Sequence, residues 1–268
     1  MAINLSASSF FDLADFVHAG IFADGKEVWH PLKDLCSYLA DCAGEALSPE
    51  LTDGRPLPET LVLAEGGVFP AAGYDIAYGS VAKGELSVSN NGREIVGASV
   101  IMAGASFLGA GIRIGRGALV EPGAMIKGPV FIGDASEVRQ GAYLRGNCLI
   151  GRRCVVGHVT ELKNVIFLDD AKAGHFAYLG DSILGNNANL GAGTKLANLR
   201  LIAGEVRVRT DDGVVGTGLH KMGAIFGDGV QTGCNSVTNP GTLLGPRSLV
   251  LPNVTVDSGY HPPGSIIR

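Results

Sequence analysis

The stretch I-R-I-G-R-G-A-L-V-E-P-G-A-M-I-K-G-P-V-F-I-G-D-A-S-E-V, residues 112–138, decides the fold. An aliphatic residue returns in it every six positions, and the same period extends in both directions. The complete series is Met102, Leu108, Ile114, Val120, Ile126, Ile132, Val138, Leu144, Ile150, Val156 and Leu162. A six-residue period is typical of a parallel β-helix, in which each hexapeptide forms a short strand and a corner.

Small residues follow many of these aliphatic residues at a distance of four positions. They are Ser106, Ala118, Ala124, Ser136, Ala142, Cys148, Cys154 and Thr160. We expect the aliphatic side chains to fill a narrow prism and the small residues to pack beside its bends. Three hexapeptides then make one coil, so that equivalent residues stack every 18 positions and each coil covers its neighbour.

The period continues with two phase slips and one long interruption. After a slip near residues 162–167 it passes through Phe167, Ala173 and Leu179, and after a second slip through Leu184, Leu190 and Leu196. Residues 199–222 alternate between charged and apolar side chains and predict a projecting β-arm. The period resumes at Phe226, Thr232, Thr238, Leu244, Val250 and Val256, and we interpret residues 261–264, His-Pro-Pro-Gly, as the terminator.

Residues 1–96 lack the six-residue period and predict a separate capping module. Ser8 and Ser9 precede an apolar stretch that favours a helix at residues 10–17. A second helix is predicted from Pro31, with Leu32, Leu35, Leu39 and Ala43 on one face. Residues 74–96 favour short strands around a turn at 90–92. We therefore predict a small α+β cap over residues 1–96, which covers the open end of a β-helix over residues 97–268.

Composition narrows the class of function. The net charge of −5 argues against general binding to nucleic acid or to acidic membranes. No uncharged apolar run approaches the ~18 residues of a transmembrane helix. The five cysteines form no C-x-x-C pair, and no signal peptide opens the chain, so we expect a cytoplasmic protein.

Two short blocks are more specific than the repeats. They are A-G-H-F-A-Y-L-G-D at residues 173–181 and N-L-G-A-G-T at residues 189–194. Over residues 97–256 the chain resembles the acetyltransferase domain of the bifunctional sugar-1-phosphate nucleotidylyltransferase/acetyltransferases, of the glucosamine-1-phosphate N-acetyltransferase type. Residues 1–96 do not resemble the nucleotidylyltransferase domain, since its L-x-G-G-x-G-T-R loop is missing, and we expect no such activity.

The resemblance implies the handedness, the assembly and the reaction. The coil should be left-handed, and the protein should be a homotrimer with active sites between subunits. It should transfer the acetyl group of acetyl-CoA to an amino sugar 1-phosphate for nucleotide-sugar synthesis, without a metal. Glucosamine-1-phosphate, galactosamine-1-phosphate and a nucleotide-linked amino sugar all stay open as acceptors.

The resemblance also assigns site residues. His175 matches the catalytic base, a role that suits an imidazole near neutral pH. Asn198 matches a residue that orients the substrate during catalysis. The remaining matches bind the sugar phosphate (Arg145, Lys163, Tyr178, Asn189 and Arg207) or meet acetyl-CoA through their backbone (Ala192 and Cys234).

Register and arm composition add two further expectations. Arg145 and Lys163 are 18 positions apart, so they should stack on one edge and hold a phosphate together. Related enzymes of the archaeal type carry lysines in the arm where this chain has Gly204 and Arg207. Arginine keeps the charge but accepts no proton, which leaves the sugar isomer undecided.

Two other classes fit parts of the sequence. A γ-type carbonic anhydrase shares the β-helix, but it needs two zinc histidines five residues apart, a spacing that these six histidines lack. A non-enzymatic trimeric scaffold, or a regulatory partner of a separate nucleotidylyltransferase, would account for the atypical segment 1–96. That alternative predicts no binding of acetyl-CoA.

Overall fold

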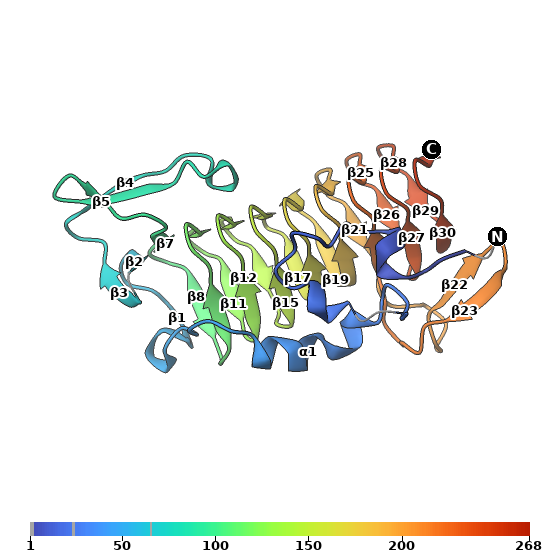
Figure 1. Ribbon diagram of the computed structural model, residues 1–268, viewed down its shortest axis with the longest axis horizontal. Helices are drawn as coiled ribbons and strands as arrows, with labels where there is room; N and C mark the ends of the chain where they lie inside the picture. The colour runs from blue at the N-terminus through green and yellow to red at the C-terminus, as the bar shows by residue number, and fades with distance from the viewer. Residues whose placement is uncertain (1–2, 23–24, 65) are drawn as a thin grey trace.

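Short parallel strands stack along one axis in the computed structural model, which describes residues 3–22, 25–64 and 66–268 (Figure 1). Equivalent residues of successive coils pair in register. Val120, for example, pairs with Val138, eighteen positions later. The aliphatic series points inward and forms one continuous core, in which Val120, Leu144 and Leu162 are completely buried. The predicted parallel β-helix is therefore confirmed.

The strands lie on three faces of a prism. The first face consists of β8 (Ser106–Leu108), β11 (Met125–Lys127), β14 (Tyr143–Leu144), β17 (Glu161–Phe167), β19 (Tyr178–Leu184), β21 (Lys195–Leu196), β26 (Val237–Thr238) and β29 (Thr255–Val256). The second face consists of β9 (Ile112–Ile114), β12 (Val130–Ile132), β15 (Cys148–Ile150), the later halves of β17 and β19, β24 (Ala224–Phe226), β27 (Thr242–Leu244) and β30 (Gly259–His261). The third face consists of β7 (Ser99–Ile101), β10 (Leu119–Val120), β13 (Glu137–Val138), β16 (Val155–His158), β18 (Lys172–His175), β20 (Asn189–Leu190), β25 (Gln231–Thr232), β28 (Leu249–Val250) and β31 (Ile266–Ile267).

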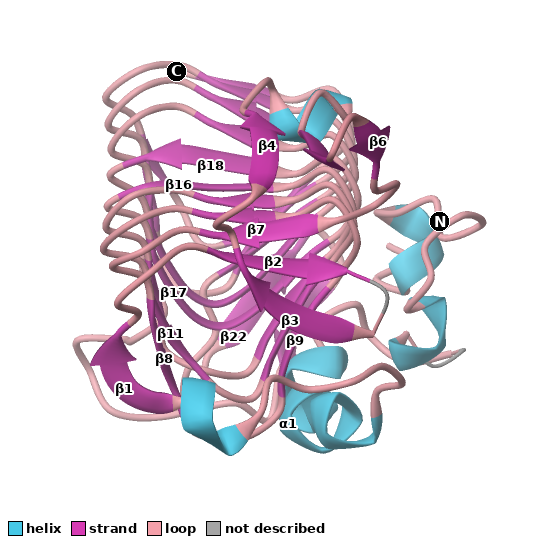
Figure 2. Cartoon of the chain, turned by 90° about the vertical axis from the view of Figure 1, so that its left-hand side faces the viewer, coloured by secondary structure: helices cyan, strands magenta, loops and turns pink. Residues whose placement is uncertain are grey.

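The coil is left-handed, as Figure 2 shows in a view along its axis from the β7 end. The third-face strands β16 and β18 point to the left, and the chain then descends through the first face and returns through the second. It thus turns counterclockwise as it recedes from the viewer. Corner residues such as Val159, Asn164 and Phe176 have positive φ, between +50° and +54°, which places the bends in the left-handed backbone region.

The predicted phase is wrong in the first coil. Val120 pairs with Ile101 and Ile126 with Phe107, nineteen positions apart, so Ile101 and Phe107 point inward instead of Met102 and Leu108. Leu108 is 40% exposed. The physical reason is the length of the corner at 109–111. The segment from Phe107 to Ile112 has one residue more than the segment from Ile126 to Val130, with which it pairs.

The two later slips are real and have a common cause. Leu162 pairs with Leu179, and Leu179 with Leu196, each seventeen positions later. Strands β17 and β19 run as continuous seven-residue strands through the corner between the first and second faces. That corner is one residue shorter than in the preceding coil, where residues 145–147 separate β14 from β15.

The predicted terminator is also wrong. Strands β30 and β31 pair in parallel with β27 and β28, so a further turn follows Val256. Pro262, Pro263 and Gly264 form a corner of that turn, in which the Ser265 amide donates to the Pro262 carbonyl at 3.3 Å. A proline fits here because its missing N–H falls at a bend instead of within a strand ladder.

The N-terminal segment lies along the second face. The middle residues of the second-face strands point outward, and from β12 onward they are apolar. Five of them are completely buried: Leu149, Ile166, Ile183, Ile225 and Leu243. They are covered by the apolar residues of the N-terminal segment, Phe10, Phe11, Phe16, Ile21, Phe22, Val28, Trp29, Leu32, Leu35 and Leu39. Helix α1 (Pro31–Asp41) is confirmed, with Leu32, Leu35 and Leu39 buried, but Ala43 lies beyond its end and is exposed.

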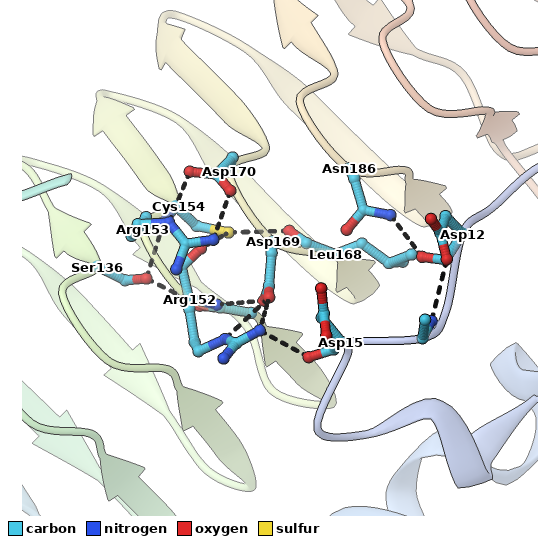
Figure 3. A network of polar contacts seen from close by, with 12 residues as sticks. Asp12, Asp15, Ser136, Arg152, Arg153, Cys154, Leu168, Asp169, Asp170 and Asn186 are labelled. Atoms are coloured by element: carbon cyan, nitrogen blue, oxygen red, sulfur yellow. Dashed lines mark hydrogen bonds and ion pairs between the residues drawn. The ribbon is translucent and has the colours of Figure 1, made fainter. Parts of the chain in front are cut away.

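No helix forms at residues 10–17, so that prediction is wrong. Short 3-10 helices η1 (Ala7–Ser9) and η2 (Ala19–Ile21) flank an irregular stretch instead. The coil takes up the backbone groups that a helix would use: the Phe10 carbonyl accepts from the Asp228 amide at 2.9 Å, and the Asp12 carbonyl accepts from the Asn186 side chain at 2.8 Å. Figure 3 shows this attachment, in which Arg152 also bridges Asp169 and the Asp15 carbonyl.

Residues 49–94 extend and cover the start of the coil. After η3 (Pro49–Leu51), strand β1 (Asp53–Pro56) pairs antiparallel with β8, and β2 (Leu61–Ala64) pairs antiparallel with β7. These pairs occupy the backbone edge of the first coil, as a cap must. Strand β3 (Gly67–Pro70) pairs with β2. A separate sheet consists of β4 (Tyr74–Ala77), β5 (Ser87–Asn90) and β6 (Arg93–Glu94), with η4 (Val81–Lys83) between β4 and β5 and the predicted turn at 90–92.

The predicted arm is confirmed as a hairpin of β22 (Arg207–Thr210) and β23 (Gly213–Gly216). It leaves the coil after Leu196, which pairs with Thr238, forty-two positions later. Its residues Val206 and Val208 are completely buried in the same apolar cluster as the N-terminal segment. Among the described residues, no helix is long and apolar enough to cross a membrane.

The cover over the second face should contribute strongly to stability. We predict that Leu35→Ala lowers the free energy of unfolding by about 2–5 kcal/mol, because Leu35 is fully buried and its truncation leaves a cavity. Val17, which is 73% exposed in the same segment, supplies the control Val17→Ala, with almost no effect expected. Chemical denaturation of the three proteins checks this, and equal midpoints for both variants would contradict the proposed cover.

Candidate active site

Three predicted site residues lie in successive coils at the corner between the third and first faces. His158 pairs with His175 at the ends of β16 and β18. The His175 carbonyl accepts from the Gly193 amide at 3.0 Å, and the Ala192 carbonyl accepts from the Asn235 amide at 2.8 Å. This ladder places His175, Ala192 and Cys234 one above another, although they span sixty residues of sequence. We call these three residues and His158 the corner column.

The environment of His175 is partly apolar and open to solvent. His175 is exposed, and the ring of Phe176 lies 6.3 Å from its own ring and 5.4 Å from that of His158. The Nδ1 atom of His158 lies 2.9 Å from the Gln140 carbonyl, which fixes that ring. Among the described residues, the His175 imidazole makes no side-chain hydrogen bond. It therefore faces outward with both nitrogens available to a ligand.

Arg145 and Lys163 lie on the first face and stack as predicted. Their neighbours Leu144 and Leu162 pair in register, and the Arg145 amide donates to the Leu162 carbonyl at 2.8 Å. Each cation has a carboxylate partner: Arg145 contacts Glu161 at 2.7 Å, and Lys163 contacts Asp181 at 3.4 Å. The edge thus alternates in charge.

Tyr178 and Asn198 lie in the same group. We call the six residues Arg145, Glu161, Lys163, Tyr178, Asp181 and Asn198 the face cluster. The Tyr178 hydroxyl donates to Asn198 Oδ1 at 3.3 Å, and the Asn198 amide donates to Asp181. Burial raises the pKa of the Tyr178 phenol, and the nearby carboxylates of Glu161 and Asp181 raise it further. The phenol therefore keeps its proton at neutral pH and donates it to Asn198 within the chain.

Asp181 and Glu161 are members of the face cluster that the site assignment did not include. Both carried a signal in the sequence. Asp181 closes the A-G-H-F-A-Y-L-G-D block and lies at the second phase slip. Glu161 directly precedes the aliphatic residue Leu162 in the sequence. Neither carboxylate was predicted, because a phosphate-binding site is expected to contain cations.

Asn189 and Arg207 do not join either group within one chain. Asn189 lies at the start of β20 on the third face, where it pairs with Lys172 and Gln231. Arg207 lies on the arm, paired with Gly216, and is exposed. Gly204 lies in the loop that leads into the arm and has a φ of +133°. Their assignment to the substrate site stays a prediction.

The cysteines fall into two environments. Cys148 and Cys154 occupy the inward small-residue positions, where burial raises the pKa of the Cys148 thiol to about 12 and that of Cys154 in the same direction. Cys234 is exposed in the corner column. Within the described ranges, no three His, Cys, Asp or Glu side chains gather to hold a metal ion.

Comparisons with known proteins agree with the fold and the blocks. Residues 126–232 match the model of the GMPPB C-terminal domain. The bifunctional sugar-1-phosphate nucleotidylyltransferase/acetyltransferase of Sulfurisphaera tokodaii is 36% identical over 107 residues, which cover 39% of this chain and 27% of that protein. The bifunctional protein GlmU of Methanococcus maripaludis strain C7 is 39% identical over 102 residues, which cover 38% of this chain and 25% of that protein.

Two further proteins match this chain over more of its length at lower sequence identity. The uncharacterized acetyltransferase YaiX of Escherichia coli O6:K15:H31 is 33% identical over 155 residues, covering 58% of this chain and 65% of that protein. The solved polysialic acid O-acetyltransferase OatWY shares 13% identity at a TM-score of 0.31, covering 57% of this chain and 78% of the other.

The comparisons confirm the resemblance to the acetyltransferase part of the bifunctional enzymes. This chain spans about a quarter of the length of the bifunctional relatives. The names of the relatives agree with the expectation of an acyltransferase.

Exposure of the cysteines gives a test of the corner column. We predict that a maleimide reagent modifies Cys36 and Cys234 in the native protein, because both side chains are exposed. Cys148 and Cys154 should react only after denaturation, since burial keeps them protonated and out of reach. Mass spectrometry of peptides checks this, and rapid native modification of Cys154 would show that the coil is misassigned there.

Proposed function

We propose that the protein is an acetyl-CoA-dependent N-acetyltransferase that acts on an amino sugar 1-phosphate, either glucosamine-1-phosphate or galactosamine-1-phosphate. The corner column carries the proposal, because it sets an exposed imidazole beside the backbone of Ala192 and Cys234 in the following coils. The names of the relatives supply the reaction class, and the reaction needs no metal.

The reaction requires a base and a group that stabilises negative charge. The amine nitrogen of the acceptor attacks the thioester carbonyl, and His175 takes the proton from that nitrogen. The carbon–sulfur bond then breaks, the acetyl group stays on nitrogen as an amide, and coenzyme A leaves as a thiolate that takes up a proton.

The backbone of the column suits the developing charge. Among the described residues, the Ala192 and Cys234 amides donate to no acceptor in the chain, whereas the adjacent Gly191 and Gly193 amides do, at 2.9 and 3.0 Å. A backbone N–H without an internal partner is available to the thioester oxygen. Cys234 serves through its backbone in this scheme and forms no acyl intermediate.

The face cluster suits the acceptor. Arg145 and Lys163 present N–H donors to a phosphate, Tyr178 adds its O–H when the hydroxyl turns from Asn198 to the ligand, and Asn198 orients the sugar. The carboxylates of Glu161 and Asp181 alternate with these cations. An amino sugar 1-phosphate bears both an ammonium and a phosphate, so an edge of alternating sign matches it better than a purely basic edge would.

Assembly into a homotrimer would complete the site. Asn189 and Arg207 lie apart from the face cluster within one chain, and we propose that they meet it across a subunit interface. Exposed apolar residues flank both halves of the site: Phe176, 54% exposed, follows His175, while Leu201 and Ile202, 106% and 76% exposed, follow Asn198. Light scattering in solution tests the assembly, and a monomeric mass would contradict it.

Replacing the base tests the chemistry. We predict that His175→Ala lowers kcat by about 10²–10⁴-fold, because the variant removes the proton acceptor. An exposed corner imidazole contributes little to the core, so the fold and coenzyme A binding should survive. Thiol release from acetyl-CoA measures turnover. Shielding of Cys234 from maleimide by acetyl-CoA, which has no free thiol, measures binding, with Cys36 as the unshielded reference.

The outcomes separate the possible functions. Wild-type turnover by His175→Ala would contradict the base assignment. If acetyl-CoA leaves the reactivity of Cys234 unchanged and no amino sugar phosphate is acetylated, the protein is instead a trimeric scaffold or a regulatory partner of a nucleotidylyltransferase.

The acceptor side gives a different kind of defect. We predict that Arg145→Ala and Lys163→Ala each raise KM for the amino sugar 1-phosphate by roughly tenfold or more, with a smaller change in KM for acetyl-CoA, because each removes a charge-assisted phosphate contact. Arg153→Ala supplies the control, since Arg153 is similarly paired, with Asp170, at a different corner. A rise in KM for acetyl-CoA alone would contradict this assignment and would place the acetyl-CoA site at the face cluster.

A further inference from the structure

Asp181 is a buried carboxylate at the centre of the face cluster. Its residue is only 5% exposed, and it lies at the corner between the first and second faces with a φ of +47°. A charge in such a place is costly unless donors surround it. Three side chains do so: Lys163 at 3.4 Å and Asn164 at 3.0 Å approach one oxygen, and the Asn198 amide donates to the other.

Two of these three donors lead directly to the proposed acceptor site. Lys163 is one of its two stacked cations, and Asn198 in turn accepts from the Tyr178 hydroxyl at 3.3 Å. The third, Asn164, also donates to the Leu32 carbonyl of α1 at 3.2 Å, which fastens the corner to the N-terminal segment. One carboxylate therefore connects the coil before its own, through Lys163 and Asn164, with the coil after it, through Asn198.

Gly180 preserves the space for this arrangement. A Cβ atom at Gly180 would collide with the Asn198 amide and would lie 2.8 Å from the Tyr178 hydroxyl. The φ of Gly180 is outside the positive range, so its backbone would accept alanine. The glycine is needed for the contact between Tyr178 and Asn198, not for the bend.

We infer that Asp181 is a positioning residue of the acceptor site. Its carboxylate fixes the Lys163 ammonium and the Asn198 amide, and through Asn198 the Tyr178 hydroxyl, in the arrangement that receives the phosphate of the acceptor. The identity of that acceptor rests on the proposed function. The fixing of Lys163 and Asn198 does not.

Asp181→Asn tests the inference with little disturbance of the backbone, because asparagine has the same shape and tolerates positive φ. The matched control is Asp170→Asn, since Asp170 also has positive φ, at +63°, and binds Arg153 at 2.6 Å, in the corner between the second and third faces (Figure 3). We expect Asp181→Asn to raise KM for glucosamine-1-phosphate or galactosamine-1-phosphate about tenfold, while KM for acetyl-CoA stays unchanged. Asp170→Asn should change neither constant.

A double-mutant cycle distinguishes positioning from a structural role. If Asp181 acts through Lys163, most of the effect of Asp181→Asn on kcat/KM should disappear in a Lys163→Met background. If the two substitutions instead lower kcat/KM by independent factors that multiply in the double variant, the inference is overturned. Should Asp181→Asn fail to fold, Gly180→Ala displaces Asn198 and Tyr178 without changing any charge, and should raise the same KM.

A measurement without turnover separates this inference from the proposed function. Lys163 is about one-third exposed, so an amine-acylating reagent can reach it. Peptide mass spectrometry should show faster acylation of Lys163 in Asp181→Asn than in wild type or Asp170→Asn, because the ammonium loses its fixed partner. Unchanged acylation would overturn the inference, even if the enzyme is active. Faster acylation with no turnover of either sugar phosphate would reject the proposed function and keep the conclusion that Asp181 fixes Lys163.

Discussion

The parallel register between successive coils is the constraint on which the other features depend. Each strand satisfies its backbone groups on the strands before and after it, so a residue at one corner must stack on its equivalent in the next coil. Register alone assembles the column of His175, Ala192 and Cys234, and it brings Arg145 beside Lys163. The arm does not interrupt the register, because Leu196 and Thr238 pair across it as neighbours do elsewhere.

Sequence period predicted the interior of the coil well, because one inward position in six must be aliphatic to fill a prism. It failed where a corner changed length without changing composition: the extra residue at 109–111 moved the inward positions to Ile101 and Phe107. It also could not show that Leu149, Ile166 and Ile183 point outward under a cover, since inward and outward apolar residues alternate within one strand. The irregular stretch at 10–17 obeys no period, as its shape follows the coil surface.

The candidate site was predictable in parts for the same reason. Residues named by a short block, such as His175 and Tyr178, occupy positions that the block itself fixes. The hydrogen bonds of Asp181 depend on the corner being one residue short, which sets its carboxylate between Lys163 and Asn198. A phase slip is visible in a sequence, but the side chains that it brings together appear only when the coils are stacked.

The cover on the second face restricts how copies of this chain can meet. A prism offers three sides, and here the N-terminal segment and the arm occupy one of them within the same chain. If copies assemble as proposed, their contacts fall on the first and third faces and on the corner that they share. The same corner bears His175 and Phe176. An intramolecular layer of aromatic residues thus limits the orientations open to a second copy, since the imidazole edge lies between the two uncovered faces.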